Sequence, residues 1–309
     1  MSIAIIYPNQ DVSDWLAALR THEPALKIEV WPEITEPGKV EFALCWNQPA
    51  GCLQQLTNLK CISSLGAGVN HLLNDITRPL DVPIVRLVDD NLKQSMAEYV
   101  MLGVLEHFRR LKDYRLLQAE KKWRELQIPH ISELGVGIMG CGAIGRYVAN
   151  KLIDFGFSVH GWSRTRKDQE RFPVYAGNDE LEPFLSQTDI LVCLLPLTPE
   201  TKNILNLKTF NQLPAGAYLI NVGRGSHLVE NELLSALDSG QLSGALLDVF
   251  REEPLPERHP FWDHSKVSIT PHIASVTNPL SAAEQIVENY RRVVSGEPFL
   301  NLVDVKCGY

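Results

Sequence analysis

The sequence of 309 residues lacks the features that would link it to a membrane or to nucleic acid. No apolar run approaches the roughly 20 residues that a membrane-spanning helix needs, and the opening MSIAIIYPNQ has no basic region, so we expect neither a membrane partner nor a signal peptide. Acidic residues outnumber basic ones by 37 to 29, which gives a net charge of −8 and argues against a nucleic-acid partner. An anionic small molecule would need a local group of positive side chains.

Closely spaced cysteine pairs are also absent. The six cysteines stand at positions 45, 52, 61, 141, 193 and 307, and several of them lie within apolar runs. Because this spacing suits neither a metal site nor a set of disulfides, we expect free thiols, no bound metal and a cytoplasmic location.

Short apolar runs alternate with amphipathic segments along most of the chain, which predicts an α/β protein with parallel sheets. The first series of expected strands covers residues 3–7, 28–31, 42–46, 61–65 and 84–87. The second series covers residues 136–139, 158–162, 190–195, 218–222, 245–249 and 267–270. Apolar residues at helical spacing predict helices over residues 94–111, 144–155, 207–212, 231–239 and about 280–295.

A glycine-rich turn follows the first strand of the second series. Gly140, Gly142 and Gly145 form the pattern G-x-G-x-x-G between an apolar run and a predicted helix. In that setting one glycine makes the tight turn, one lets the backbone approach a pyrophosphate, and one lets helix and strand pack closely. The free N–H groups at the helix N-terminus attract phosphate. The turn therefore predicts a dinucleotide-binding site, whereas a purely structural glycine turn is the alternative.

A basic segment follows the next strand, where an NAD-binding protein has an acidic residue for the ribose 2′-hydroxyl. The residues are Ser163, Arg164, Thr165, Arg166 and Lys167, with no carboxylate among them. Arginines and hydroxyls bind a phosphate well, and a carboxylate would repel it. The segment predicts NADPH as the cofactor, with NADH as a weaker substitute, unless it is only a solvated loop.

Three polar residues follow three later strands. Arg224 lies in NVGRG, Glu253 in DVFREEP and His272 in TPHIA. Arginine binds a carboxylate bidentately, histidine donates a proton near neutral pH, and a neighbouring glutamate favours the imidazolium. These types suit the reduction of a 2-keto acid, although each residue also has an ordinary structural explanation and Glu252 is an alternative to Glu253.

The same motifs resemble those of the D-2-hydroxyacid dehydrogenase family. The glycine turn, NVGRG at 221–225, DVF with EPLP at 248–256 and TPHIA at 270–274 occur in the order expected for it and span most of the chain. WSRTRK at 162–167 and the closing Gly308-Tyr309 resemble the glyoxylate/hydroxypyruvate reductase A branch of that family.

The resemblance implies two Rossmann-like domains with parallel sheets. The first and last segments, residues 1–95 and 277–309, would form a flavodoxin-like substrate domain, and residues 96–276 would form the inserted dinucleotide-binding domain. It also implies a homodimer that forms through the region around residues 100–130.

The resemblance further assigns roles to individual residues. Arg224 would bind the substrate and polarise its carbonyl, His272 would be the general acid, and Glu253 would be its partner. The backbone N–H groups of Ala67 and Gly68 would hold the substrate carboxylate, and Trp46 would line the pocket or be an ordinary core residue. The remaining expected cofactor contacts are Ala143, Ile144, Leu195, Pro196 and, at the nicotinamide carboxamide, Asp248.

Two stretches depart from the usual family pattern, residues 275–278 after His272 and residues 89–95. Because both could border the substrate, the reaction type is better defined than the substrate. The alternatives are a D-lactate or phosphoglycerate type of dehydrogenase, and a dinucleotide-sensing binding protein of the same fold, which would not need the proton donor His272.

Overall fold

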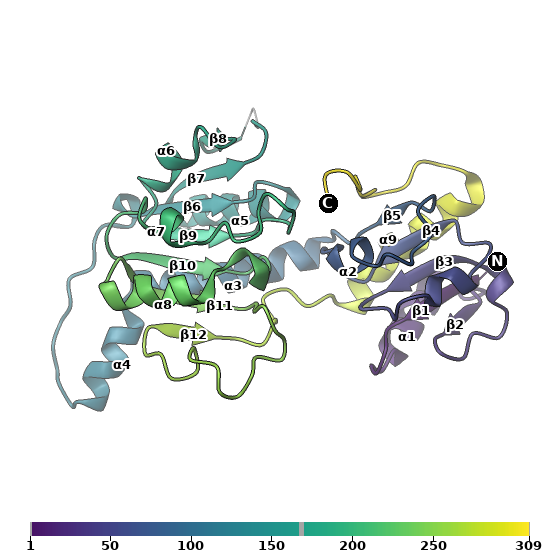
Figure 1. Ribbon diagram of the computed structural model, residues 1–309, viewed down its shortest axis with the longest axis horizontal. Helices are drawn as coiled ribbons and strands as arrows, with labels where there is room; N and C mark the ends of the chain where they lie inside the picture. The colour runs from purple at the N-terminus through teal and green to yellow at the C-terminus, as the bar shows by residue number, and fades with distance from the viewer. Residues whose placement is uncertain (1, 167–169, 309) are drawn as a thin grey trace. The chain divides into compact units, whose positions relative to one another are not determined.

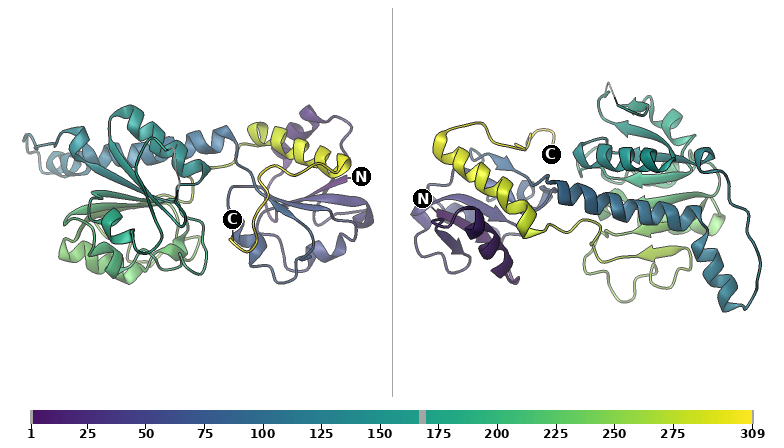
Figure 2. Two further views of the ribbon diagram at one scale, coloured as in Figure 1. Left: turned by 90° about the horizontal axis from the view of Figure 1, so that it is seen from above. Right: turned by 180° about the vertical axis from the view of Figure 1, so that it is seen from behind.

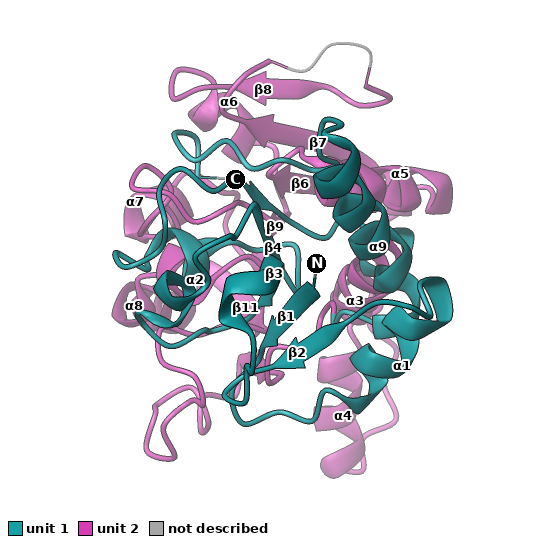
Figure 3. Cartoon of the chain, turned by 90° about the vertical axis from the view of Figure 1, so that its right-hand side faces the viewer, with its two compact units in different colours: residues 1–92, 276–309 teal, residues 93–275 magenta. Residues whose placement is uncertain are grey.

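The computed structural model describes residues 2–166 and 170–308, and the chain divides into two compact units. Unit 1 contains residues 1–92 and 276–309, and unit 2 contains residues 93–275 (Figure 3). The first unit boundary lies after residue 92 where the sequence suggested 95, and the second lies after residue 275 where it suggested 276. Among the described residues, no helix has both the length and the apolar character needed to cross a membrane.

Unit 1 is built on a five-stranded sheet in the order β2-β1-β3-β4-β5 (Figure 1). All pairings between these strands are parallel, and the order is that of flavodoxin-like sheets. The strands are β1 (Ser2–Ile6), β2 (Ile28–Val30), β3 (Val40–Cys45), β4 (Cys61–Ser64) and β5 (Ile84–Val85).

Helices cover both faces of this sheet, which explains why its strands are apolar on both sides. On one face, Trp15, Ala18 and Leu19 of the first helix are buried at helical spacing, and they share a core with Ile286 and Val287 of the last helix. The opposite face is covered by a shorter helix and a 3₁₀ turn. These elements are α1 (Ser13–His22), α9 (Pro279–Ser295), α2 (Asn70–Leu73) and the turn Cys52–Gln55.

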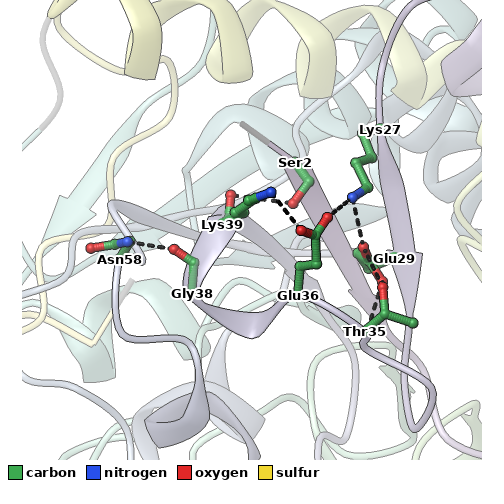
Figure 4. Close-up of polar contacts among 8 residues, drawn as sticks. All are labelled: Ser2, Lys27, Glu29, Thr35, Glu36, Gly38, Lys39 and Asn58. Carbon is green, nitrogen blue, oxygen red and sulfur yellow. Dashed lines mark hydrogen bonds and ion pairs between the residues drawn. The ribbon is translucent and has the colours of Figure 1, made fainter.

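A cluster of polar contacts closes the open edge of unit 1 beside β2 (Figure 4). Glu36 pairs with both Lys27 and Lys39, and these two hydrogen bonds lower the pKa of its carboxyl to about 2. Glu29 accepts a hydrogen bond of 2.9 Å from the backbone N–H of Thr35. Because these contacts tie the edge strand to the segment that follows it, we interpret the cluster as structural.

Unit 2 is built on a seven-stranded sheet in the order β12-β11-β10-β9-β6-β7-β8, again with parallel pairings throughout. From β8 to β11 this order follows the Rossmann pattern, in which the first strand lies in the middle and the chain winds outward on both sides. The strands are β6 (Gly135–Met139), β7 (Ser158–Ser163), β8 (Val174–Ala176), β9 (Ile190–Cys193), β10 (Ala217–Asn221), β11 (Leu242–Leu247) and β12 (Val267–Ile269).

Helices also lie on both faces of the sheet of unit 2 (Figure 2). One face is covered by α3 and α5, whose Val100, Val104 and Val148 enter the same core as Ile138 of β6. The other face is covered by α6, α7 and α8. The helices that include residues of unit 2 are α3 (Asp90–Phe108), α4 (Leu111–Ala119), α5 (Ala143–Phe155), α6 (Leu181–Leu185), α7 (Leu207–Phe210) and α8 (Glu230–Ser239).

Two expectations from the sequence were wrong in detail. The single helix expected over residues 94–111 ends at Phe108, and α4 begins at Leu111, because Arg110 adopts the left-handed conformation with φ of 55°. The apolar period continues through this break, so periodicity alone does not detect it. Strand β8 was not expected, because it is an edge strand in which only the first of three residues is buried, so it has no continuous apolar run.

Acid should destabilise the fold through three histidines. Burial lowers the pKa of His107, His160 and His227 from 6.5 to about 4. Between these values the unfolded chain binds protons that the folded chain does not, so the free energy of unfolding falls as the pH falls through this window. Each unequally bound proton contributes about 1.4 kcal/mol per pH unit.

We expect denaturant unfolding to show this loss between about pH 7 and pH 5, before most carboxylates titrate. A His160→Phe variant should have a flatter dependence, because it removes one of the three groups. A free energy of unfolding that does not change over this range would contradict the expectation.

Candidate functional site

The glycine turn joins β6 to α5 through backbone that only glycine fits. Gly140 has φ of 107°, and a Cβ there would lie 2.8 Å from the carbonyl carbon of Leu194. A Cβ at Gly145 would lie 1.9 Å from the carbonyl oxygen of Gly140, so helix and turn could not pack this closely with any other residue. The two glycines therefore bring the start of α5 directly against the end of β6.

The start of α5 has the form of a pyrophosphate site. Gly142 precedes the first helical residue, Ala143, and a Cβ at Gly142 would meet no described atom within 4 Å. The N–H groups of the first turn, including those of Ala143 and Ile144, have no carbonyl partner within the helix. Open space beside free N–H groups at the positive end of a helix suits a phosphate, so these residues fit a dinucleotide.

The basic segment lies at the end of β7. Ser163 is buried, and its hydroxyl donates a hydrogen bond of 2.7 Å to the carbonyl oxygen of Thr165. Arg164, Thr165 and Arg166 are exposed, whereas Lys167 lies outside the described residues. The hydroxyl of Ser163 thus shapes the segment, and the two guanidinium groups lie at its surface.

A carboxylate is nevertheless present at this strand end, which the sequence analysis missed. Glu180, the residue before α6, pairs with Arg166 and also accepts a hydrogen bond of 2.7 Å from the backbone N–H of Ala176. Glu200 lies close enough to Arg164 that the arginine contributes to lowering its pKa, after the larger effect of a hydrogen bond from Thr198. Both glutamates lie well beyond the basic segment in the sequence, so only the fold reveals them.

Arg224, Glu253 and His272 follow three neighbouring strands, β10, β11 and β12 (Figure 1). The side chain of Arg224 donates a hydrogen bond of 2.6 Å to the carbonyl oxygen of Gly223. Burial lowers the pKa of Arg224, and the nearby charge of Glu253 opposes this shift. An arginine stays protonated even so, which leaves a partly buried cation at this edge of the sheet.

His272 and Glu253 are in direct contact. Nδ1 of His272 lies 2.8 Å from Oε2 of Glu253, and Oε1 of Glu253 accepts a hydrogen bond of 2.9 Å from the backbone N–H of Phe250. Burial alone would raise the pKa of Glu253, but the hydrogen bonds from His272 and Phe250 hold it below its usual value. The side chain of His272 is 40% exposed, and none of the described residues forms a hydrogen bond with its other nitrogen, Nε2. Glu252 makes no such contact with His272 among the described residues.

The backbone of the histidine turn is held by Asp248, which is buried at the end of β11. Its Oδ1 accepts hydrogen bonds from the Thr270 hydroxyl at 2.6 Å and the Ile273 N–H at 2.8 Å, and its Oδ2 accepts one from the Ala274 N–H at 2.9 Å. These bonds stabilise the left-handed conformation of His272, whose φ is 56°. Asp248 therefore organises the turn that presents the histidine.

Leu195 and Pro196, two further expected cofactor contacts, follow β9. Leu195 is buried in the core of unit 2. The carbonyl oxygen of Pro196 accepts a hydrogen bond of 2.7 Å from the Thr201 hydroxyl. In the order of strands in the sheet, the segment therefore follows the strand that lies between β6, which leads into the glycine turn, and β10, which leads into Arg224.

The expected substrate loop belongs to unit 1. The loop begins at Gly66, which packs closely against Trp46. A Cβ at Gly66 would lie only 2.7 Å from the indole ring. The Ser64 hydroxyl donates a hydrogen bond of 2.7 Å to the carbonyl oxygen of Gly68. None of the described residues accepts a hydrogen bond from the N–H of Ala67 or Gly68. These N–H groups are half-buried donors in a loop of fixed shape.

Comparisons with known proteins agree with one another. The family model described as D-isomer specific 2-hydroxyacid dehydrogenase, NAD binding domain, matches residues 101–274. Glyoxylate/hydroxypyruvate reductase A of Yersinia enterocolitica is 42% identical over 315 residues, which cover 100% of both chains.

Solved structures are also similar over the whole chain. A D-isomer specific 2-hydroxyacid dehydrogenase from Xanthobacter autotrophicus in complex with NADPH and MES has a TM-score of 0.96 and 40% identity, covering 100% of this chain and 99% of that one. An NADPH-dependent glyoxylate/hydroxypyruvate reductase from Sinorhizobium meliloti, solved with NADP and sulfate, has a TM-score of 0.93 and 36% identity, covering 100% of both chains.

Proposed function

This chain belongs to the D-isomer specific 2-hydroxyacid dehydrogenase family, and we propose that it is an NADPH-dependent reductase of small 2-keto acids. Its substrates are glyoxylate, which gives glycolate, and hydroxypyruvate, which gives D-glycerate. The observation that carries this proposal is the contact between His272 and Glu253, at strand ends beside that of Arg224 in the dinucleotide-binding sheet. A binding protein that only senses a dinucleotide would have no use for this proton donor.

Each of the three side chains has a separate role in the reduction of the carbonyl. Arg224 binds the substrate and draws electron density toward the carbonyl oxygen. When bound, the reduced nicotinamide supplies the hydride for the carbonyl carbon. His272 donates a proton from Nε2 to the carbonyl oxygen, so that C=O becomes CH–OH, and the neutral ring then takes a proton from solvent. Glu253, whose pKa is held below its usual value, is ionised at neutral pH and orients the ring through its contact with Nδ1.

The cofactor contacts of this proposal follow the strand ends of unit 2. The glycine turn with Ala143 and Ile144 holds the pyrophosphate. Ser163, Arg164, Thr165 and Arg166 hold the ribose 2′-phosphate, which makes NADH a weaker substitute. An exposed ion pair such as Arg166 with Glu180 contributes little, so the phosphate can displace it. Leu195 and Pro196 are further cofactor contacts, and Asp248 contacts the nicotinamide carboxamide.

Unit 1 supplies the substrate domain in this proposal. The N–H groups of Ala67 and Gly68 are donors for the substrate carboxylate, and Trp46 shapes the loop that carries them.

The substrate preference can be tested directly with purified protein. We expect rapid NADPH oxidation with glyoxylate and hydroxypyruvate, slower oxidation with pyruvate, and little with 3-phosphohydroxypyruvate, because no cation is proposed for the phosphate of that substrate. A clear preference for 3-phosphohydroxypyruvate would show that the enzyme belongs to the phosphoglycerate type instead.

We also propose that the protein is a cytoplasmic homodimer that forms through residues 100–130. Trp123 is fully exposed and Leu116 is 58% exposed in this region. Association through this region would remove their apolar surface from water. The six cysteines are free thiols, as suits a reducing compartment. Sedimentation velocity should give a dimer for the unmodified protein and a weaker one for Trp123→Glu. A monomer at micromolar concentration would rule the dimer out.

A further inference from the structure

His227 is a fully buried histidine that the proposed reaction does not use. It is the last residue of the 3₁₀ turn Gly225–His227, which begins directly after Arg224, and it is 0% exposed. Its Nδ1 accepts a hydrogen bond of 3.0 Å from the backbone N–H of Arg224, and its Nε2 lies 3.2 Å from the carbonyl oxygen of Pro196. A backbone N–H can only donate and a carbonyl can only accept, so the ring is neutral and carries its proton on Nε2.

The surroundings of the ring keep it in this state. Burial lowers the pKa of His227 to about 4, and the positive charge of Arg224 acts in the same direction. The other titratable group against the ring is Cys193, whose Sγ lies 3.7 Å from Nδ1 and whose pKa burial raises to about 12. At neutral pH the ring of His227 therefore has one acceptor, Nδ1, and one donor, Nε2. It does not exchange protons with a substrate.

The two partners of His227 belong to different loops at the same edge of the sheet. Arg224 follows β10, and Pro196 follows the neighbouring strand β9. The ring also packs closely against the loop that carries Arg224. Gly223 of this loop is so near that a Cβ there would lie 2.9 Å from Nδ1 of His227. A backbone hydrogen bond of 2.9 Å from Leu205 to the carbonyl oxygen of His227 holds the residue in place.

We propose that His227 is a positioning residue, which sets the backbone of the substrate arginine relative to the Pro196 segment that faces the cofactor. This inference rests on the proposed function, because it assigns a substrate to Arg224 and a dinucleotide to Pro196. Each hydrogen bond has its own consequence. The bond to the Arg224 N–H aligns the guanidinium for a carboxylate, and the bond to Pro196 holds the wall of the cofactor site.

Two substitutions separate the two bonds. Asparagine places an oxygen where His227 has Nδ1, so His227→Asn keeps the acceptor for Arg224 and loses the donor to Pro196. Glutamine places an amide nitrogen near the position of Nε2, so His227→Gln keeps the donor and loses the acceptor. His160→Gln is the matched control, since His160 is also a buried histidine of unit 2, bonded through Nε2 to the Thr188 hydroxyl at 2.7 Å.

Binding measurements test the proposal without turnover. NADPH affinity is measured from its fluorescence, and oxamate, a non-reacting compound with a carboxylate beside a carbonyl, is titrated into the NADPH-saturated protein. We expect His227→Gln to weaken oxamate binding about 5- to 50-fold with NADPH affinity nearly unchanged, because a buried N–H loses its partner. We expect His227→Asn to weaken NADPH binding about 3- to 10-fold with a smaller effect on oxamate. The control variant should change neither constant, although it lowers the melting temperature.

A purely structural role would give a different result, in which both His227 variants change the two constants in equal proportion or leave both unchanged. Either outcome would overturn the proposal, as would a failure of the unmodified protein to bind oxamate. Nitrogen NMR of the labelled histidines gives an independent check, because the His227 signals should report the Nε2-protonated neutral ring at neutral pH. If the protein binds both ligands but does not reduce glyoxylate, the proposed function fails while the variants still test the role of His227.

Discussion

Replacing His272 with asparagine should lower kcat for glyoxylate reduction by about 10²- to 10⁴-fold, the usual contribution of a positioned general acid. Asparagine can still accept or donate a hydrogen bond, but it cannot deliver a proton to the developing alkoxide. Cofactor binding should survive, because the expected NADPH contacts lie on other loops. Stopped-flow measurement of NADPH oxidation and fluorescence titration of NADPH would separate the two effects.

The Glu253→Gln variant is the natural companion, since it leaves the imidazole in place and removes only the charge beside it. We expect it to remain active with a reduced kcat, because the glutamine oxygen can still accept the hydrogen bond that orients the ring, whereas the negative charge beside the imidazole is lost. An unchanged kcat in His272→Asn would remove the histidine from the mechanism, whatever the glutamine variant does.

Replacing Arg164 and Arg166 together with alanine should abolish most of the preference for NADPH over NADH. A charged hydrogen bond contributes about 1.5–3 kcal/mol, so each arginine that contacts the 2′-phosphate strengthens NADPH binding by roughly 10- to 150-fold. The loss should occur mainly in KM for NADPH, because the ribose is remote from the transferred hydride. KM for NADH should change little, since NADH has no phosphate to lose.

Arg171→Ala is a suitable control for this double variant. Arg171 lies in the same unit and pairs with Asp154 at 2.8 Å on the surface, so its loss removes one positive charge of that unit without removing an expected cofactor contact. Added salt should weaken NADPH binding more than NADH binding, because screening acts on the phosphate contacts. Equal use of the two cofactors by the unmodified protein would show that the basic segment is a solvated turn.

Much of the site could be predicted because parallel strands bring their carboxyl ends to one edge of a sheet. Knowing that Arg224, Glu253 and His272 each follow a strand was enough to group them. The choice between Glu252 and Glu253 could not be made in this way. It depends on the path of the loop after β11, in which the Phe250 N–H binds Oε1 of Glu253 and so turns Oε2 toward His272.

The features that the sequence analysis missed depend on contacts between distant segments. Glu180 reaches Arg166 only because α6 begins beside the end of β8, where the Ala176 N–H holds the same carboxylate. His227 is one of nine histidines, and its importance depends on the 3₁₀ turn that buries it between two loops. No spacing rule identifies such a residue, because its partners are backbone groups present at every position.

The most direct test of the central claim is the stoichiometry of a reaction between the purified protein, NADPH and glyoxylate. We expect the absorbance of the reduced nicotinamide to fall only when glyoxylate is present, with one glycolate formed for each NADPH oxidised. We also expect a higher kcat/KM with NADPH than with NADH in the same assay. NADPH that binds but is never oxidised in the presence of glyoxylate, hydroxypyruvate or pyruvate would contradict the account and favour a protein that only senses the dinucleotide.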